Sequence, residues 1–452
     1  MYSKSLFIFR RDLRVDDNTG LIEALHSSHE VLPCFIFDHR LLKDGKYSKN
    51  ALQFMLESLA DLEKQLELVS GKLYLFSGLP HEVIEKLIRE ESIDAVFVNC
   101  DYTPFSARRD ELISMVCAEH GLKFHQFHDA TLQVPGSVKT QQGKMYQVFT
   151  QFFRAASKLS VEVPVHVERG NFCNSYISDA LEAIPEYDSD NPELFVHGGS
   201  SNALELLSDL SRFADYDRLR DIPSVMGTTG LSAHNRFGTV SIREVYHSLR
   251  DHLGSDHTLI SELYWRDFFI QLASEHPRVF GHAFREKFDN LHWDNDPVRF
   301  NAWCEGKTGF PIVDAGMRQL NTTGYMHNRV RMIAASFLVK DLHIDWRLGE
   351  IYFARALVDY DPCVNNGNWQ WSASTGADAT PYFRIFNPWL QQQKFDPECK
   401  YIKKWVPELG DLSPKDIHAL ENKALPKDIV YPQPVVDHKV EKNKTLGMFR
   451  FV

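Results

Sequence analysis

The chain has 452 residues, of which 43% are hydrophobic and 25% are charged, and its formal net charge is −11 at pH 7. These values are ordinary for a soluble globular protein of two or three domains, and no stretch approaches the ~20 apolar residues that a membrane-spanning helix needs. The apolar run at the N-terminus is too short for a signal peptide and is broken by charge, so we expect a cytoplasmic protein.

Residues 1–130 alternate between short apolar runs and amphipathic stretches. This alternation predicts an α/β domain with a five-stranded parallel, doubly wound sheet. No G-x-G-x-x-G follows the first strand, so the usual dinucleotide fingerprint is missing. Strands are expected at Leu6–Phe9, Val31–Phe37, Leu73–Phe76, Ala95–Val98 and Lys123–Phe127, and helices at Asn18–His26, Lys49–Leu68, His81–Glu90 and Ser106–His120.

Residues 131–200 are interrupted by prolines and end in a Gly-Gly-Ser-Ser run, which is typical of an interdomain connector, with one helix expected near Tyr146–Leu159. From residue 201 to 452 the strand patterns disappear, and helical periodicity predicts an all-α domain. The helices are expected at Asn202–Arg212, Ser241–His252, Thr258–Ser274, Pro297–Glu305, Ile312–Leu320, His327–Val339 and Glu350–Val358.

Two windows of the sequence carry positive charge without any Asp or Glu, residues 137–158 and residues 315–340. Each window has a charge of +4, and an acidic protein can bind DNA through one such face. The cations are Lys139, Lys144, Arg154 and Lys158 in the first window and Arg318, Arg329, Arg331 and Lys340 in the second.

All eight tryptophans lie between residues 265 and 405. A large helical core accounts for part of this cluster, because tryptophan marks cores and interfaces, and aromatic chemistry is the alternative for the rest. The tryptophans are Trp265, Trp293, Trp303, Trp346, Trp369, Trp371, Trp389 and Trp405.

The segment 262–269 places Glu262, Trp265 and Arg266 on one face of a predicted helix, at positions i, i+3 and i+4. A base flipped out of a duplex requires a stacking surface and a hydrogen-bonding group at its edge, and this face offers both. The same residues also suit an intrahelical Glu262–Arg266 ion pair beside a core tryptophan.

Two further segments carry polar groups in compact patterns. Asn328 and Met332 are one helical turn apart with Arg331 beside them, a set that could hold a flavin edge or a phosphate. The run 359–371 contains three asparagines and a glycine, which favours a tight, non-helical turn. The segment 227–234 has Gly and hydroxyl residues ahead of a helix, a pattern that suits anion capture or plain capping.

Metal binding is not expected anywhere in the chain. The seven cysteines are scattered, and no two have C-x-x-C spacing, so neither a zinc site nor a disulfide framework is supported. The acids Asp359 and Asp361 are not accompanied by a His or Glu cluster with ligand spacing.

Taken together, these segments resemble the photolyase/cryptochrome family along essentially the whole chain, most densely from about 216 to 407. The resemblance implies an N-terminal α/β antenna domain and an all-helical C-terminal domain that buries FAD. In that family a light-excited, reduced flavin passes an electron to a pyrimidine dimer flipped out of UV-damaged DNA, and the electron returns after the dimer splits. The matching strings are Ile8–Arg14, Leu263–Phe269, Gly309–Arg318, Met326–Met332, Asn365–Trp371 and Tyr382–Pro388.

The resemblance also assigns cofactor contacts. Asn365 matches the residue that faces flavin N5, and Arg331 matches the partner of Asp359. The other positions expected to bind FAD are Tyr216, Thr228, Thr229, Gly230, Leu231, Ser232, Tyr360 and Asp361.

For the substrate, Glu262 matches the carboxylate that hydrogen-bonds the dimer, and Trp265 and Trp371 match the aromatic walls of the lesion pocket. Trp369, Trp346 and Trp293 match a relay that carries an electron from solvent to the oxidised flavin, whereas Trp303, Trp389 and Trp405 match nothing beyond packing. Further contacts with damaged DNA are expected from Arg220, Arg266, Asn328, Met332 and Arg384.

Three residues indicate which type of family member this chain resembles. Repair of (6-4) lesions needs two histidines where this chain has Asn328 and Met332, so the resemblance implies cyclobutane dimers, as in class I photolyases. Asn365 suits a fully reduced flavin, whereas plant cryptochromes have Asp there and animal ones typically have Cys. The alternative is a cryptochrome-type blue-light photoreceptor without repair activity.

Some features stay open at this level. Asp267 stands where many class I enzymes have Glu. The segment 101–105 lies where antenna contacts are expected but does not match a folate-binding pattern, so a deazaflavin, a folate, a second flavin or an empty pocket all remain. The expected partner is UV-damaged DNA, and the protein is expected to be a monomer without membrane or metal contacts.

Overall fold

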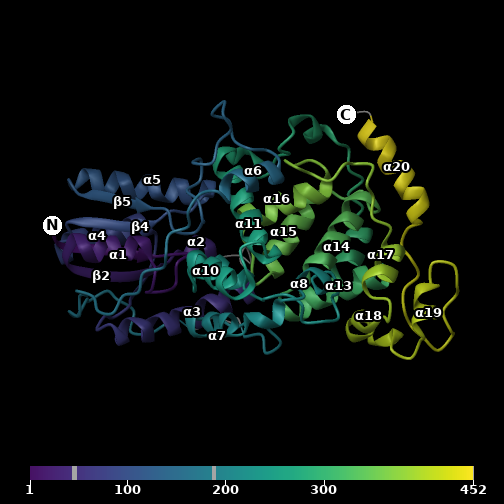
Figure 1. Ribbon diagram of the computed structural model, residues 1–452, viewed down its shortest axis with the longest axis horizontal. Coiled ribbons are helices and arrows are strands. Elements are labelled where there is room, and N and C mark those ends of the chain that lie inside the picture. The colour runs from purple at the N-terminus through teal and green to yellow at the C-terminus, as the bar shows by residue number, and fades with distance from the viewer. Residues whose placement is uncertain (43–47, 186–189, 451–452) are drawn as a thin grey trace.

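A parallel sheet forms one end of the molecule and a helical body forms the rest (Figure 1). The computed structural model describes residues 1–42, 48–185 and 190–450. All neighbouring strands pair in parallel, in the order β3-β2-β1-β4-β5, which confirms the predicted five-stranded sheet. The strands are β1 (Tyr2–Phe9), β2 (Ser28–Phe37), β3 (Tyr74–Ser77), β4 (Ala95–Asn99) and β5 (Lys123–Phe127).

Helices cover both faces of this sheet, because the central strands are apolar on both sides. Phe7 and Phe9 of β1 pack in one core with α1 and α3, while Leu6 and Ile8 pack in another with α4 and α5. This two-sided burial confirms the doubly wound arrangement. The helices of this region are α1 (Thr19–Ser27), α2 (His39–Leu42), α3 (Lys49–Leu68), α4 (Pro80–Glu91) and α5 (Pro104–Glu119).

The strand order reverses between β1 and β4, and the crevice at their carboxyl ends faces the helical body. In such sheets the side chains that follow the two strands meet at this point. Arg11, which follows β1, donates from Nη1 to Oδ1 of Asp101, which follows β4, at 2.9 Å. The other terminal nitrogen of Arg11 donates to Asp361 of the helical body. Arg11 therefore links this edge of the sheet directly to the helical body.

The helical body is built around α13, α14, α15 and α16, which pack on one another and share the largest core. Strands are absent after Phe127 in the part of the chain that the structure describes. None of the described helices is both long and apolar enough to span a bilayer. The α-helices are α6 (Phe149–Ala156), α7 (Ser200–Ser208), α8 (Tyr216–Leu219), α9 (Ser232–Phe237), α10 (Ile242–Leu253), α11 (Thr258–Glu275), α12 (Pro297–Cys304), α13 (Pro311–Thr323), α14 (Asn328–Lys340), α15 (Trp346–Ala356), α16 (Pro362–Ala373), α17 (Pro388–Phe395), α18 (Lys400–Trp405), α19 (Pro414–His418) and α20 (His438–Arg450).

The tight turn predicted for residues 359–371 is wrong, because residues 362–373 form the helix α16. Asp361 caps this helix by accepting from the backbone N–H groups of residues 363 and 364, and Pro362 occupies its first turn. The polar residues serve tertiary contacts: Asn366 donates from Nδ2 to the carbonyl of Val279 at 3.0 Å. The helix is thus stabilised by its cap and its neighbours in spite of a composition typical of turns.

A buried ionic network joins the sheet region to the helical body. Arg243 of α10 donates to Asp17 at 2.8 Å and to Asp129 at 3.0 Å, and Asp129 also accepts from Arg14 at 2.7 Å. All four side chains are less than a tenth exposed. Charges buried in this way are tolerable only when each is paired, so the network fixes how the two halves meet.

Candidate functional site

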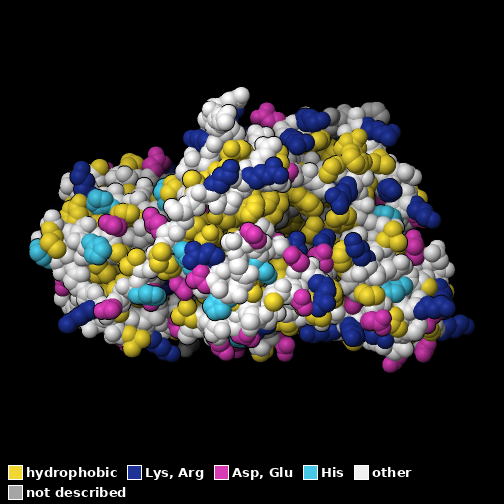
Figure 2. Space-filling view, viewed as in Figure 1, with side chains coloured by type: hydrophobic (Ala, Val, Ile, Leu, Met, Phe, Trp, Pro, Cys, Tyr) yellow, Lys and Arg dark blue, Asp and Glu magenta, His cyan; other side chains and the backbone are white. Residues whose placement is uncertain are grey.

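A hollow opens near the middle of one face of the molecule, over α11, α15 and α16, and hydrophobic side chains line it (Figure 2). Lys and Arg side chains gather around this hollow. The helices that carry most of the predicted site residues, α8, α11, α14 and α16, lie around it (Figure 1). We therefore describe the predicted residues by the contacts that each makes there.

Glu262 of α11 forms an ion pair with Arg220, which directly follows α8. Arg220 Nη1 lies 2.7 Å from Glu262 Oε1, and both side chains are about one third exposed. Burial raises the pKa of Glu262, and Arg220 opposes that rise. Tyr216 lies beside the pair, with its ring 5.6 Å from the Arg220 guanidinium carbon. The intrahelical alternative, a Glu262–Arg266 pair, is therefore wrong.

Arg331 and Asp359 form the expected pair through two hydrogen bonds, of 3.1 and 2.8 Å. The Arg331 guanidinium also lies over the ring of Tyr325, whose hydroxyl is 3.5 Å from Thr228 Oγ1. Thr228 belongs to the predicted diphosphate segment, in which Leu231 donates from its backbone N–H to Thr229 Oγ1. The hydroxyl segment and the Arg331–Asp359 pair are thus brought together through Tyr325, a residue that the sequence patterns did not single out.

Asp361 is held by cations on several sides. Burial alone would raise the pKa of Asp361, but the guanidinium groups of Arg11, Arg236 and Arg266 bring it below its usual value. Arg236 also donates from Nε to the carbonyl of Tyr360 at 2.7 Å. Asp361 is consequently an ionised cap for α16, and its side chain is committed to Arg11 and to the helix backbone.

Asn365 lies on the first turn of α16 next to Glu350 of α15. Its Nδ2 donates to the Glu350 carbonyl at 3.3 Å, and Asn366 Nδ2 donates to Glu350 Oε1 at 3.1 Å. Burial raises the pKa of Glu350 to about 7, although the bond from Asn366 lowers it in part. Glu350 is a titratable neighbour of Asn365 that the sequence reasoning missed, because its helical spacing alone gives no signal.

The aromatic and cationic residues of the α11 face separate in the structure. The Trp265 ring stacks on Phe149 of α6 with a centroid distance of 3.6 Å, and Trp371 is half-buried on α16. Arg266 is only 12% exposed and donates to the carbonyls of Ala130 and Asn235. Arg266 therefore joins the end of the sheet region at Ala130 to the helical body, and the structure does not bring it to the surface as the expected DNA contact.

Three further predicted residues lie at or near the surface. Asn328 is exposed at the start of α14, and Met332 is half-buried one turn later. Arg384 is exposed in the segment between α16 and α17. The side chains of Asn328 and Met332 do not titrate near neutral pH.

The three tryptophans of the predicted relay are all buried in the core of the helical body. Trp369 makes ring contacts with Phe353 at 5.0 Å and with Trp303 at 6.2 Å. The structure therefore places Trp303 next to Trp369, a neighbour that the sequence did not reveal. Trp346 and Trp293 lie in the same core.

The acid-free window 315–340 does not form a basic surface, contrary to the expectation. Arg318 pairs with Glu408, Arg329 pairs with Asp221, and Arg331 pairs with Asp359. The fourth cation, Lys340, is fully buried. Acids distant in the sequence thus neutralise the three arginines of this window.

The cations of the other window, 137–158, are exposed. Among the described residues, no ion pair involves Lys139, Lys144, Arg154 or Lys158.

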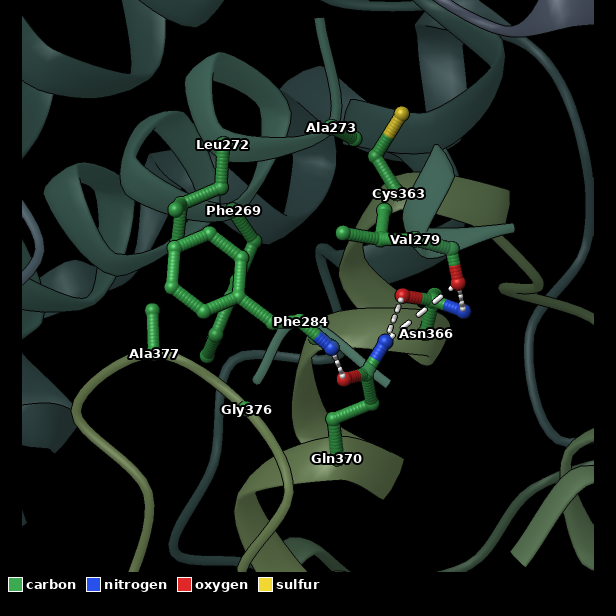
Figure 3. A pocket seen from close by; sticks show the side chains of 11 residues that line it. Phe269, Leu272, Ala273, Val279, Phe284, Cys363, Asn366, Gln370, Gly376 and Ala377 are labelled. Carbon is green, nitrogen blue, oxygen red and sulfur yellow. Dashed lines mark hydrogen bonds between the residues drawn. The ribbon is translucent and has the colours of Figure 1, made fainter. Parts of the chain in front are cut away.

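A small cavity of about 20 Å³ lies between α11 and α16, and Figure 3 shows its lining. Gln370 bridges it by donating to Asn366 Oδ1 at 2.9 Å and by accepting from the Phe284 backbone N–H at 2.7 Å. A cavity of this size holds a water molecule and no larger ligand. It belongs to the packing of the two helices.

The residues around the hollow fit the parts of FAD. Hydroxyl groups and backbone N–H groups at 228–232 suit a diphosphate, and the Arg331–Asp359 pair offers donors and acceptors for a polar ring edge. Asn235 Oδ1 is buried, and it has no partner among the described residues, so it is available as an acceptor. Within the described ranges, no group of three or more His, Cys, Asp or Glu side chains is arranged to hold a metal ion.

The fold and the site define a two-part protein whose helical half binds a flavin, and comparisons with known proteins identify the family. A family model described as DNA photolyase matches residues 5–168, and one described as the FAD binding domain of DNA photolyase matches residues 259–450. The chain is 38% identical to the deoxyribodipyrimidine photo-lyase of Vibrio cholerae, over 98% of each chain. It belongs to the DNA photolyase family and contains the FAD-binding domain of that family.

Solved structures agree with this assignment. An archaeal photolyase from Sulfolobus tokodaii, described as holding two FAD molecules, has a TM-score of 0.88 at 42% identity, covering 99% of this chain and 100% of that one. A cryptochrome from Synechocystis has a TM-score of 0.90 at 28% identity, covering 99% of each chain. The fold is thus shared by a protein named photolyase and by one named cryptochrome, so the fold alone does not separate the two.

Proposed function

We propose that the protein is a deoxyribodipyrimidine photo-lyase that repairs cyclobutane pyrimidine dimers in UV-damaged DNA with light. The observation that carries this proposal is the Glu262–Arg220 pair, which holds a half-buried carboxylate beside Tyr216 on helices that border the hollow. A carboxylate in that place accepts hydrogen bonds from the N–H groups of a flipped-out pyrimidine. The proposal is supported by the similarity to the Vibrio cholerae photo-lyase over nearly the whole chain.

The chain's own groups position the substrate and the cofactor. When bound, reduced FAD excited by light supplies the electron that opens the dimer. Glu262 orients the dimer, Trp371 and Trp265 line the lesion pocket, and Arg331 with Asp359 and Asn365 holds the flavin ring. Thr228, Thr229 and Ser232 bind the diphosphate.

Asn328 and Met332 favour cyclobutane dimers over (6-4) lesions. Splitting a cyclobutane ring requires electron transfer but no proton transfer, whereas (6-4) repair requires an acid–base pair. The side chains at these two positions can neither donate nor accept a proton at neutral pH. The protein is therefore expected to repair cyclobutane dimers and to leave (6-4) lesions unchanged.

The experiment is illumination of the fully reduced protein with an oligonucleotide that contains one thymine dimer, with a (6-4) photoproduct as the control substrate. We expect loss of the dimer and no change in the control, measured by chromatography of the products. Reduced, illuminated protein that leaves the dimer intact would overturn the proposal and favour the photoreceptor alternative, which the fold similarity to the Synechocystis cryptochrome supports.

A second chromophore is part of the same proposal. The Sulfolobus tokodaii photolyase holds two FAD molecules, and this chain shares 42% identity with it, so we infer that the sheet region, residues 1–130, takes an antenna chromophore. The connector 131–200 and the helical region 201–452 complete the proposed domain division. An absorption spectrum of the chromophores released from a known amount of purified protein detects a deazaflavin or a folate, and the ratio of FAD to protein distinguishes one FAD from two.

A further inference from the structure

A groove of about 490 Å³ lies between the segment 384–391 and the first turns of α20. It is separate from the cavity between α11 and α16. Arg384, Lys439 and Lys442 contribute the cations of its lining, and Asn387 and Gln391 contribute amides. The groove lining contains no Asp or Glu.

The cations of this groove are free to bind an anion. Arg384, Lys439 and Lys442 form no ion pair within the part of the chain that the structure describes, in contrast to Arg329 and Arg331, which acids neutralise. Lys439 and Lys442 are three residues apart on α20, so their side chains lie on the same side of the helix. The groove therefore combines three unneutralised positive charges in one place.

The groove is also rigid, because buried contacts fix α20 against the helical body. His438 Nδ1 lies 2.5 Å from Asp341 Oδ1, and Thr445 Oγ1 donates to the Lys340 carbonyl at 2.5 Å. Tyr382, two residues before Arg384, stacks on Phe449 of α20 with a centroid distance of 5.6 Å. Both walls of the groove are thus joined to each other, so the backbone around it is already ordered, and the ordering cost of binding falls on the exposed side chains.

We propose that this groove holds the sugar–phosphate backbone of duplex DNA that flanks the lesion. The inference rests on the proposed function, since it extends the substrate surface from the hollow to α20. Lys and Arg side chains gather over α20 on the same face as the hollow (Figure 2). Arg offers a fork and Lys a point charge for phosphate oxygens, and contacts of this kind position DNA without reading its sequence.

The test is the double variant Lys439→Gln, Lys442→Gln, with Lys444→Gln as its matched control. Lys444 is on the same helix, but its ammonium group pairs with Asp294 outside the groove. Affinity for lesion-containing duplex is measured across a range of salt concentrations. Two lost phosphate contacts reduce the slope of log K against log salt by about 1.8, so the wild type should lose about tenfold more affinity than the double variant between 50 and 200 mM salt.

The control Lys444→Gln should keep the wild-type slope. A short single-stranded oligonucleotide that carries the dimer reaches only the hollow, so the double variant should bind and split it as the wild type does. A wild-type slope for the double variant on duplex, or an equal loss of binding on the short substrate, would overturn the groove assignment.

A third arm separates this inference from the proposed function. Undamaged duplex also carries the phosphate backbone, so the double variant should show the reduced slope there as well. If reduced protein fails to repair dimers but the slope on undamaged duplex still falls, the proposed function is wrong and the groove assignment stands. If repair proceeds and neither duplex shows a reduced slope, only the groove assignment is wrong.

Discussion

The Trp369 side chain is held in place by the residues that pack around its ring. It is buried, and its ring contacts Phe353 and Trp303 edge-on. Gly349 of α15 allows this approach, since a Cβ there would lie 2.2 Å from the Trp369 ring. The tight packing holds the indole in one orientation, which suits the electron relay that the family resemblance implies for it.

Replacement of Trp369 by Phe should slow photoreduction of the oxidised flavin at least tenfold, because phenylalanine is much harder to oxidise than tryptophan. Repair by protein that has been reduced beforehand should change little, since that reaction does not use the relay. The measurement is the rate of flavin bleaching under blue light beside the rate of dimer loss. Trp389→Phe is the matched control, because Trp389 is equally buried but has no proposed part in electron transfer. Equal loss of both activities in the Trp369 variant would contradict the relay.

At the scale of residues, some contacts of the site could be predicted from the sequence and others could not. The Arg331–Asp359 pair was expected from family resemblance, and the structure contains it. The links from Arg11 to Asp361 and from Arg220 to Glu262 join residues 350 and 42 positions apart, and no local pattern encodes such pairs. Arg266 could not be separated from a surface cation by its spacing, because its partners are backbone carbonyls of other segments.

At the scale of elements, α16 depends on one glycine. Gly367 faces Phe269 of α11, and a Cβ at this position would lie 2.1 Å from the Phe269 ring. The close approach of α11 and α16 thus requires a residue without a side chain, and α16 carries Asn365 and Trp369 on that same backbone.

Gly367→Ala should destabilise the protein by about 1–3 kcal/mol through overpacking, despite the higher helix propensity of alanine. Gly447→Ala in α20 is the control, because nothing lies within 4 Å of a Cβ there, and we expect it to be neutral or to stabilise by up to about 1 kcal/mol. The measurement is the melting temperature of both variants and of the wild type by thermal denaturation, and only Gly367→Ala should melt at a lower temperature. Similar melting temperatures for the two variants would show that α11 shifts to accommodate the methyl group.

Helices and strands could be predicted from the sequence where burial determines the spacing of apolar residues. Strands β1 to β4 are predictable because their runs are buried on both faces, whereas the residues of the edge strand β5 are exposed or only partly buried. Helix α3 has the predicted bounds because its apolar residues recur with helical period. Helix α16 was missed because three asparagines and a glycine favour a turn locally, whereas its stability comes from the Asp361 cap and from contacts with α11 and α15. Tertiary contacts outweigh local propensity in that segment.

At the scale of the whole molecule, the two halves are joined by buried charge. Asp267 of α11 accepts from the backbone N–H groups of Leu132 and Gln133 in the connector, at 2.8 and 3.3 Å. Burial raises the pKa of Asp267 to about 7, although Arg266 and the two backbone donors oppose the rise. The joint between the halves therefore contains a carboxyl group that titrates near neutral pH.

This titration predicts a pH dependence of stability. Between the unfolded value of 3.8 and the folded value of about 7, the folded protein binds more protons at Asp267 than the unfolded chain. The contribution of Asp267 to folding is therefore complete below pH 3.8 and is lost as the pH rises through 7. Asp267→Asn cannot ionise, so its melting temperature should fall less than that of the wild type between pH 5 and pH 8. Parallel curves would show that Asp267 is ionised in the folded protein.

The exposed cations of residues 137–158 and those of the α20 groove belong to a chain with a net charge of −11. These exposed cations concentrate positive charge on part of the surface of an otherwise acidic chain. A polyanion then exerts a torque on the approaching protein, and the acidic remainder is repelled. Encounters are therefore pre-oriented, and the association rate constant, not only the equilibrium affinity, should fall steeply with ionic strength.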